Sequence, residues 1–228
     1  MRANSNRELI AIVANGLGDL LSKVVFIGGA VTELYASAET EILEVRATDD
    51  VDCVIQLLNY SKFAAFEEEL RSRKFINDPN KIMRWNYAGI TVDVMPDDEK
   101  ILGFSNPWYT EGIKNAVPYQ LNENLNIAIF TLPYFLASKL TALFDRGMAD
   151  LRLSKDLEDI VFCLFYCADF RIEIYKAGYA VRAFIIEGVN KLLLNPHIDE
   201  AIYCTLPSGE VNEENMELII ERLNRMKG

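Results

Sequence analysis

Two aspartates one residue apart, at the start of an otherwise apolar run, constrain the fold of this chain more than any other feature. Asp50 and Asp52 begin the segment 50–56, in which valine, cysteine and isoleucine dominate. Such a run predicts a strand, and residues i and i+2 of a strand point to the same face of a sheet. Carboxylates held side by side in a sheet are costly unless a cation compensates them. The pattern therefore predicts a cation-binding point on a sheet.

A third aspartate lies in a second strand-like run. Thr91, Asp93 and Met95 alternate with Ile90, Val92 and Val94, which places Asp93 on one face of its strand. Mg²⁺ is held by a few carboxylates together with waters and phosphates. Three carboxylates suit a pair of ions about 3.5–4 Å apart. We expect Asp50, Asp52 and Asp93 to form a catalytic magnesium site for two ions, where Mn²⁺ could substitute; the alternative is acids that simply face water.

A glycine pair precedes these acids. Gly28 and Gly29 follow the apolar segment 23–27 and open a stretch expected to be helical to about Ala38. A helix N-terminus donates amide hydrogen bonds to phosphate, and glycine lets the backbone approach it; the alternative is a tight turn. Neither the P-loop pattern nor the dinucleotide-binding glycine pattern occurs in the chain.

Two cations lie seven residues apart in the second half. Lys139 and Arg146 share a face of the helix expected over 133–146, and both residue types bind polyphosphate. The alternative is a lysine stem lying along apolar surface and an arginine paired with a nearby acid. Asp156 and Asp159, at i and i+3 of the next helix, would orient the cations, contact the base, or form plain salt bridges.

Periodicity predicts an α+β fold. An amphipathic helix is expected over 7–21, strands over 23–27, 51–57 and 124–130, a helix over 61–73 starting at a Ser61 cap, and a hairpin from 82–87 and 90–95. Segment 97–119 is rich in loop-forming residues, and its aromatic side chains Phe104, Trp108 and Tyr109 should cover the core. Further helices are expected over 155–168, 180–194 and 213–226. The composition changes near residue 131, which predicts a mixed-sheet catalytic domain (1–130), a helical domain (131–228) and an active site in the cleft between them.

Composition excludes several classes of function. The chain has 228 residues and a formal net charge of −11, whereas a dedicated binder of duplex DNA needs a basic surface. No apolar run is long enough to span a membrane and no signal-peptide core is present, so we expect a cytoplasmic protein without a membrane partner. The four cysteines form no Cys-x-x-Cys pair and are expected to be reduced core residues. His197 is the single histidine, which excludes a two-histidine zinc helix.

These segments together resemble the nucleotidyltransferase superfamily that includes DNA polymerase β. Its members carry a glycine pair opening a helix, an Asp-x-Asp on the next strand and a third aspartate on a later strand. The segment 137–146, followed by Lys155-Asp156-Leu157-Glu158-Asp159, is similar to the AbiEii-type branch, which includes toxin halves of type IV toxin–antitoxin pairs. The matching stretches span roughly residues 24–162. Arg46 and Thr48 also match the family pattern, which implies that they contact phosphate or brace the loop.

The resemblance implies a nucleotidyltransferase-type mixed sheet followed by a helical domain. It further implies Mg²⁺-dependent transfer of a nucleoside monophosphate from an NTP to a hydroxyl acceptor, with release of pyrophosphate. In the AbiEii-type branch the acceptor would be a tRNA end, and the partner a cognate antitoxin. One alternative is transfer to a small molecule, as in antibiotic-modifying nucleotidyltransferases. Another is a toxin-neutralising or other interaction protein on the same fold, against which the three aspartates argue.

Overall fold

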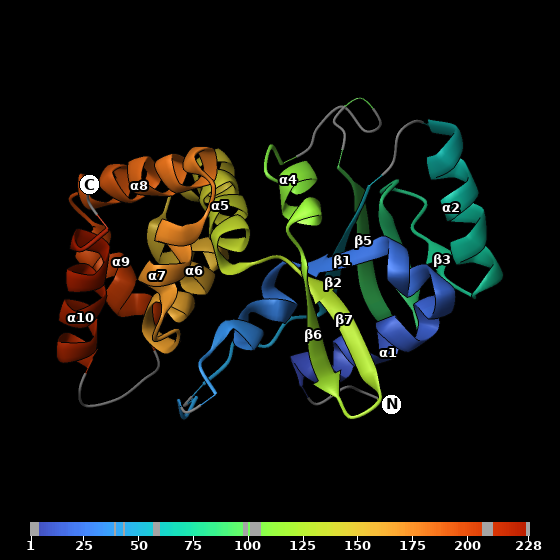
Figure 1. The fold of residues 1–228 in the computed structure, drawn as a ribbon, viewed down its shortest axis with the longest axis horizontal. Helices are drawn as coiled ribbons and strands as arrows, with labels where there is room; N and C mark the ends of the chain where they lie inside the picture. The colour runs from blue at the N-terminus through green and yellow to red at the C-terminus, as the bar shows by residue number, and fades with distance from the viewer. Residues whose placement is uncertain are drawn as a thin grey trace. The chain divides into compact units, whose positions relative to one another are not determined.

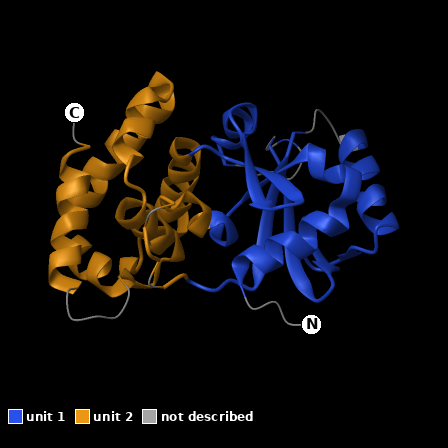
Figure 2. Ribbon diagram, turned by 60° about the horizontal axis from the view of Figure 1, so that its bottom comes forward, with its two compact units in different colours: residues 1–31, 46–131 blue, residues 32–45, 132–228 orange. Residues whose placement is uncertain are grey.

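The computed structural model of the chain describes residues 5–38, 40–42, 44–56, 60–97, 100, 106–206 and 212–226. It has the predicted α+β fold, with a mixed seven-stranded sheet and many helices. Its internal contacts divide the chain into two compact units, coloured separately in Figure 2. Unit 1 comprises residues 1–31 and 46–131, and unit 2 comprises residues 32–45 and 132–228. Each unit is described by itself.

The sheet belongs to unit 1, and its strands follow the order β3-β4-β5-β2-β1-β7-β6 (Figure 1). The strands are β1 (Val24–Ile27), β2 (Asp50–Ile55), β3 (Ile76–Asn77), β4 (Arg84–Tyr87), β5 (Ile90–Pro96), β6 (Val117–Asn122) and β7 (Leu125–Ile129). β2 runs parallel to β5 and β1 parallel to β7, and the other neighbours are antiparallel. The expected hairpin is confirmed: β4 and β5 meet at Ala88 and Gly89, which both have positive φ, as primed hairpin turns require.

The helix α1 (Asn6–Leu17) covers part of the sheet, where it packs against β2 and β5. The Ser5 hydroxyl accepts a hydrogen bond from the Glu8 amide and so caps its first turn. Its buried stripe includes Ile10, Val13 and Leu17. The helix ends earlier than expected, because Gly18 has a φ of 54° and leads into the 3₁₀ helix η1 (Gly18–Lys23).

Two further helices complete the description of unit 1. α2 runs over Tyr60–Ser72, so the prediction that Ser61 caps this helix is wrong, and Ser61 lies inside the helix. α4 (Tyr109–Lys114) lies in the segment 97–119, which was expected to be loop, and strand β6 begins in it. Both were missed for local reasons, because α4 is short and β6 is an edge strand that contains Pro118. The Tyr109 hydroxyl donates to Sδ of Met95 at 3.8 Å; Phe104 lies outside the described residues.

Unit 2 is helical. Its elements are α5 (Leu132–Ala142), which continues as a π-helical turn η3 (Leu143–Gly147), then η4 (Leu151–Leu153), α6 (Lys155–Tyr166), α7 (Phe170–Lys176), α8 (Tyr179–Leu193), α9 (Ile198–Thr205) and α10 (Asn212–Asn224). The four expected helices correspond to α5, α6, α8 and α10, with shifted ends. The shorter α7 and α9 were not expected. Within the described part of the chain, no helix is both long and apolar enough to cross a membrane.

The expectation that all four cysteines lie in the core is wrong for one of them. Cys53, Cys163 and Cys167 are buried, as expected, and all four thiols are free. Cys204, however, is exposed. It lies in the last turn of the short helix α9, on a face that the rest of unit 2 does not cover. Periodicity could not reveal this, because α9 was not expected as a helix.

Candidate carboxylate site

The strand register of unit 1 brings the three predicted carboxylates to one face of the sheet. In the parallel pair β2–β5, Asp52 lies beside Asp93 and Asp50 lies beside Thr91. Val51 and Val92, which alternate with these acids, are completely buried, whereas the aspartates are half-buried. Alternation along both strands therefore sends the valines to the core and all three carboxylates to the opposite face.

Gly28 adjoins the Asp52 carboxylate. The antiparallel pairing of β1 with β2 places Ile27 opposite Asp52, and the chain turns at the next residue. Gly28 has a φ of +77°, and a Cβ atom built on it would lie 1.9 Å from Oδ2 of Asp52. Only glycine fits both the conformation and the contact. The structure thus gives the first glycine of the pair a role in seating a carboxylate.

Gly29 adjoins the segment that leads into β2. A Cβ atom on Gly29 would lie 2.5 Å from Nη2 of Arg46 and 3.1 Å from Cγ2 of Thr48. The helix that Gly29 opens is a 3₁₀ helix, η2 (Gly29–Tyr35), which ends before the expected Ala38. Such a short helix has a weak N-terminal dipole. The geometry therefore explains Gly29 by its contact with Arg46 and Thr48, and its assignment to phosphate stays a prediction.

Asn6, which the sequence did not single out, fixes the same segment. Its Nδ2 donates to the Arg46 carbonyl at 2.9 Å, and its Oδ1 accepts from the Thr48 amide at 3.1 Å. Thr48 Oγ1 in turn donates to the Asp50 carbonyl at 2.8 Å. Asn6 is only 5% exposed, so its side chain acts as an internal brace between α1 and the start of β2. A polar residue at the start of an amphipathic helix gives no sequence signal for this role.

Arg84 is the second residue that sequence reasoning missed. It lies directly opposite Asp93 in the antiparallel pair β4–β5. Its Nε donates to Oδ1 of Asp93 at 2.7 Å, and its Nη2 donates to Oδ2 at 2.6 Å. The hydrogen bonds with Asp93 raise the pKa of Arg84 above its usual range, and the negative charges of Asp93, Asp50 and Asp78 add to this effect. The carboxylate face therefore contains its own cation.

The donor chemistry of this face fits a divalent metal ion. Carboxylate oxygens are the ligands that Mg²⁺ and Mn²⁺ prefer, and Asp50, Asp52 and Asp93 supply them from two adjacent strands. Among the residues that the structure describes, however, no group of three His, Cys, Asp or Glu side chains is arranged to hold a metal ion. Both oxygens of the third carboxylate, Asp93, accept hydrogen bonds from the Arg84 guanidinium.

The predicted cations of the helical half form a separate cluster inside unit 2. Lys139 is buried, and its Nζ lies 2.5 Å from Oδ2 of Asp159 and 3.4 Å from Oδ1 of Asp156. Arg146 donates to both oxygens of Asp156, at 3.0 and 3.2 Å. Its side chain is 72% exposed, whereas that of Lys139 is 10% exposed. The structure thus brings Lys139, Arg146 and Asp156 together, and Arg146 is the more accessible cation. Their assignment to a nucleotide stays a prediction.

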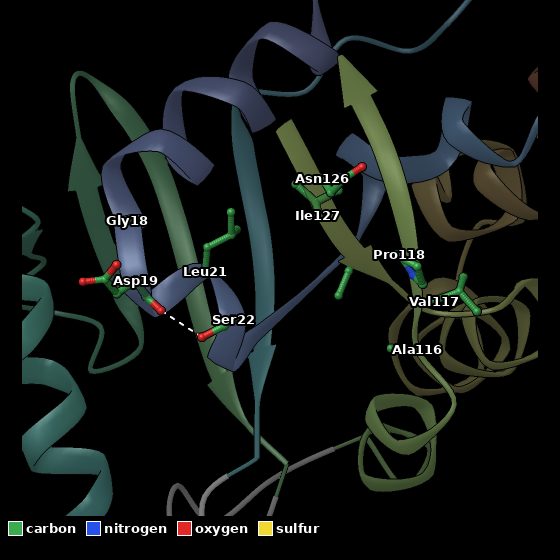
Figure 3. A pocket seen from close by; sticks show the side chains of 10 residues that line it. Gly18, Asp19, Leu21, Ser22, Ala116, Val117, Pro118, Asn126 and Ile127 are labelled. Carbon is green, nitrogen blue, oxygen red and sulfur yellow. Dashed lines mark hydrogen bonds between the residues drawn. The ribbon is translucent and has the colours of Figure 1, made fainter. Parts of the chain in front are cut away.

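An open depression of about 640 Å³ lies elsewhere on unit 1. Figure 3 shows Leu21 and Ser22 of η1 on one side of it and Val117 and Pro118 of β6 on the other. Its described lining residues are mostly apolar and do not include the three aspartates. The depression therefore offers no cation to a phosphate and is not part of the carboxylate face.

Comparison with protein-family models finds none that matches the chain, and comparison with curated proteins finds no significant match.

Proposed function

We propose that the protein is a nucleotidyltransferase that moves a nucleoside monophosphate from an NTP to a hydroxyl acceptor. The observation that carries this proposal is the register of β2 and β5, which sets Asp52 beside Asp93 with Asp50 on the same face. Phosphoryl transfer depends on positioning and on compensation of phosphate charge, and clustered carboxylates on a rigid sheet suit it because they can hold the divalent cation that supplies this compensation. The order of the glycine pair, Asp-x-Asp and later aspartate is similar to that of the superfamily of DNA polymerase β, and we extend its fold layout to unit 1.

In the proposed reaction, an acceptor oxygen attacks the α-phosphorus of the NTP and the bond to the pyrophosphate oxygen breaks. The hydroxyl proton passes to a carboxylate, for which Asp93 is the candidate. Magnesium held by Asp50, Asp52 and Asp93 would supply Lewis acidity to the acceptor oxygen and to the phosphates. Gly28 keeps the Asp52 carboxylate in place through its close contact. Asn6 keeps Arg46 and Thr48 beside Gly29, where the family resemblance implies that they contact phosphate or brace the loop.

We propose a tRNA end as the acceptor and a cognate antitoxin as the partner, on the strength of the similarity of residues 137–159 to the AbiEii-type branch. A net charge of −11 suits an acceptor that is engaged at one end better than a long duplex. Transfer to a small hydroxyl compound uses the same carboxylates, so the acceptor has to be identified by experiment.

The test is transfer of label from each α-³²P-labelled NTP, in turn, in the presence of Mg²⁺. The acceptors are total tRNA in one series and aminoglycosides in another. We expect one NTP to label tRNA with wild-type protein, and Asp50→Asn and Asp52→Asn to lose the transfer. Label on the aminoglycoside alone would replace the tRNA proposal. Absence of transfer to either acceptor, with release of neither pyrophosphate nor labelled product, would reject the proposed activity and favour an interaction protein.

A further inference from the structure

We infer that Arg84 is a built-in stand-in for a metal cation, which holds Asp93 on the carboxylate face and is exchanged when a divalent ion binds there. The inference rests on the proposed function, because it concerns the same three aspartates. It assigns to Arg84 a positioning role before the reaction begins. The contact of Arg84 with Asp93 determines the affinity with which Asp93 binds a metal ion.

The Arg84 guanidinium binds both oxygens of the Asp93 carboxylate. The guanidinium uses two donors, Nε and Nη2, on the two oxygens of one carboxylate, at 2.7 and 2.6 Å. Such a two-pronged pair fixes the orientation of the carboxylate as well as neutralising it. An incoming cation therefore finds the oxygens of Asp93 already accepting charged hydrogen bonds, whereas they would otherwise be the third source of ligands beside Asp50 and Asp52.

The charges on the carboxylate face set Arg84 and a metal ion in competition for Asp93. Asp52 lies beside Asp93 in the strand register, and Asp93 and Asp50 both raise the pKa of Arg84. A divalent ion that uses all three carboxylates has to share Asp93 with the Arg84 guanidinium, which already binds both of its oxygens. A metal ion and a guanidinium repel each other at short range. Binding of the ion to Asp93 and retention of the Arg84 pair therefore oppose each other.

The Arg84 side chain lies at the surface of the sheet, where it can leave Asp93. Its side chain is 28% exposed, and the next residue, Trp85, points the other way and is buried. A long side chain at the surface end of a strand face can swing into water without opening the core. Exchange of Arg84 for a cation would therefore leave the sheet and its buried face intact, which a pair inside the core would not allow.

The experiment measures Mn²⁺ binding to the full chain without nucleotide, by the loss of the electron paramagnetic resonance signal of free Mn²⁺. The variants are Arg84→Met, Arg84→Lys, Asp52→Asn, Asp93→Asn and the double variant Arg84→Met/Asp93→Asn. Lys23→Met is the matched control, because Lys23 pairs with Glu69 on the exposed surface of the same unit and carries the same charge. Thermal melts in metal-free buffer establish that each variant is folded; Arg84→Lys, which keeps the charge but loses the fork, serves if Arg84→Met does not fold.

We expect Arg84→Met to bind Mn²⁺ about tenfold more tightly than wild type or better, since a hydrogen-bonded charge pair no longer has to be broken. Arg84→Lys should lie between the two, and Lys23→Met should match wild type. Adding Asp93→Asn should remove the gain. Equal affinity in wild type, Arg84→Met and Arg84→Lys, with binding still dependent on Asp52, would overturn the inference and leave the proposed metal site standing. Absence of Mn²⁺ binding in every variant would overturn both.

Discussion

A methyl group on Gly28 would lie 1.9 Å from Oδ2 of Asp52, so the carboxylate is seated directly against the α-carbon of this glycine. Gly28 also has a φ of +77°, a conformation that costs other residues about 1 kcal/mol or more. The pair therefore links backbone conformation to the position of a proposed metal ligand. It also gives the first of the predictions.

Gly28→Ala should destabilise unit 1 by about 2–4 kcal/mol, since backbone strain and a steric clash add. Gly89→Ala is the matched control: its φ is +86° and nothing lies within 4 Å of the new methyl group, so it should cost only about 1 kcal/mol. Urea unfolding of both variants measures the difference. Equal losses would show that Asp52 moves aside at no cost and that the glycine serves the turn alone.

Asp50→Asn should abolish nucleotidyl transfer without lowering the melting temperature in metal-free buffer. The substitution removes a proposed ligand and also relieves repulsion among the three carboxylates of the face. Transfer of label and differential scanning calorimetry in EDTA provide the two readouts. A clear loss of stability in EDTA would mean that Asp50 serves mainly as a structural partner of a cation.

Asn6→Ala should cost about 2 kcal/mol, because it removes two partly buried hydrogen bonds that hold Arg46 and Thr48. If this segment binds phosphate, as proposed, the variant should also raise the KM for NTP more than it lowers kcat, since the segment loses its brace. Ser5→Ala is the control on the same helix: it removes the cap of α1, at about 1 kcal/mol, and should leave KM unchanged. A KM that shifts equally in both variants would indicate general loosening of α1.

Lys139→Met should destabilise unit 2 by about 3 kcal/mol or more, because Asp156 and Asp159 are 4% and 2% exposed and would lose their buried cation. Arg146→Met should cost less than about 1 kcal/mol, since its side chain is largely exposed. If Arg146 serves the nucleotide, this second variant should nonetheless raise the KM for NTP. Chemical unfolding with steady-state kinetics separates the two cations, and similar stability losses would contradict the difference in burial.

Iodoacetamide at pH 8 should label Cys204 before the other cysteines in the folded protein. Cys204 is exposed, whereas burial raises the pKa of the Cys53 and Cys163 thiols well above their usual range. Burial also raises the pKa of Cys167, to about 11. A raised pKa means less reactive thiolate at a given pH. Peptide mass spectrometry locates the label; rapid labelling of Cys53 in native protein would contradict its burial.

The sequence predicted the carboxylate face because alternation along a strand is a local property. Alternation places Asp50 and Asp52 on the same face of β2. It places Asp93 on the face of β5 opposite to that of Val92 and Val94. What alternation could not provide is the pairing of β2 with β5 in a register that sets Asp52 beside Asp93. That pairing joins strands far apart in the chain and depends on how the whole sheet assembles.

Arg84, by contrast, was within reach of the sequence. The hairpin was expected with its turn at Ala88 and Gly89, and a two-residue turn fixes the register of both strands. Counting outward from Tyr87 opposite Ile90 places Arg84 opposite Asp93. The burial of Lys139 was not within reach, because helical spacing gives its face but not the packing of α5 against α6 and α8.

The course of the chain between the two units limits how the protein can be divided. Segment 32–45 interrupts the sequence of unit 1 but belongs to unit 2, where the Ser37 amide donates to the Tyr166 carbonyl and the Tyr35 ring lies 4.5 Å from that of Phe135. A single cut near residue 131 would therefore separate this segment from the helices it packs on. Neither fragment would be a self-sufficient module, so truncation, fusion or exchange of the helical half alone should yield poorly folded protein.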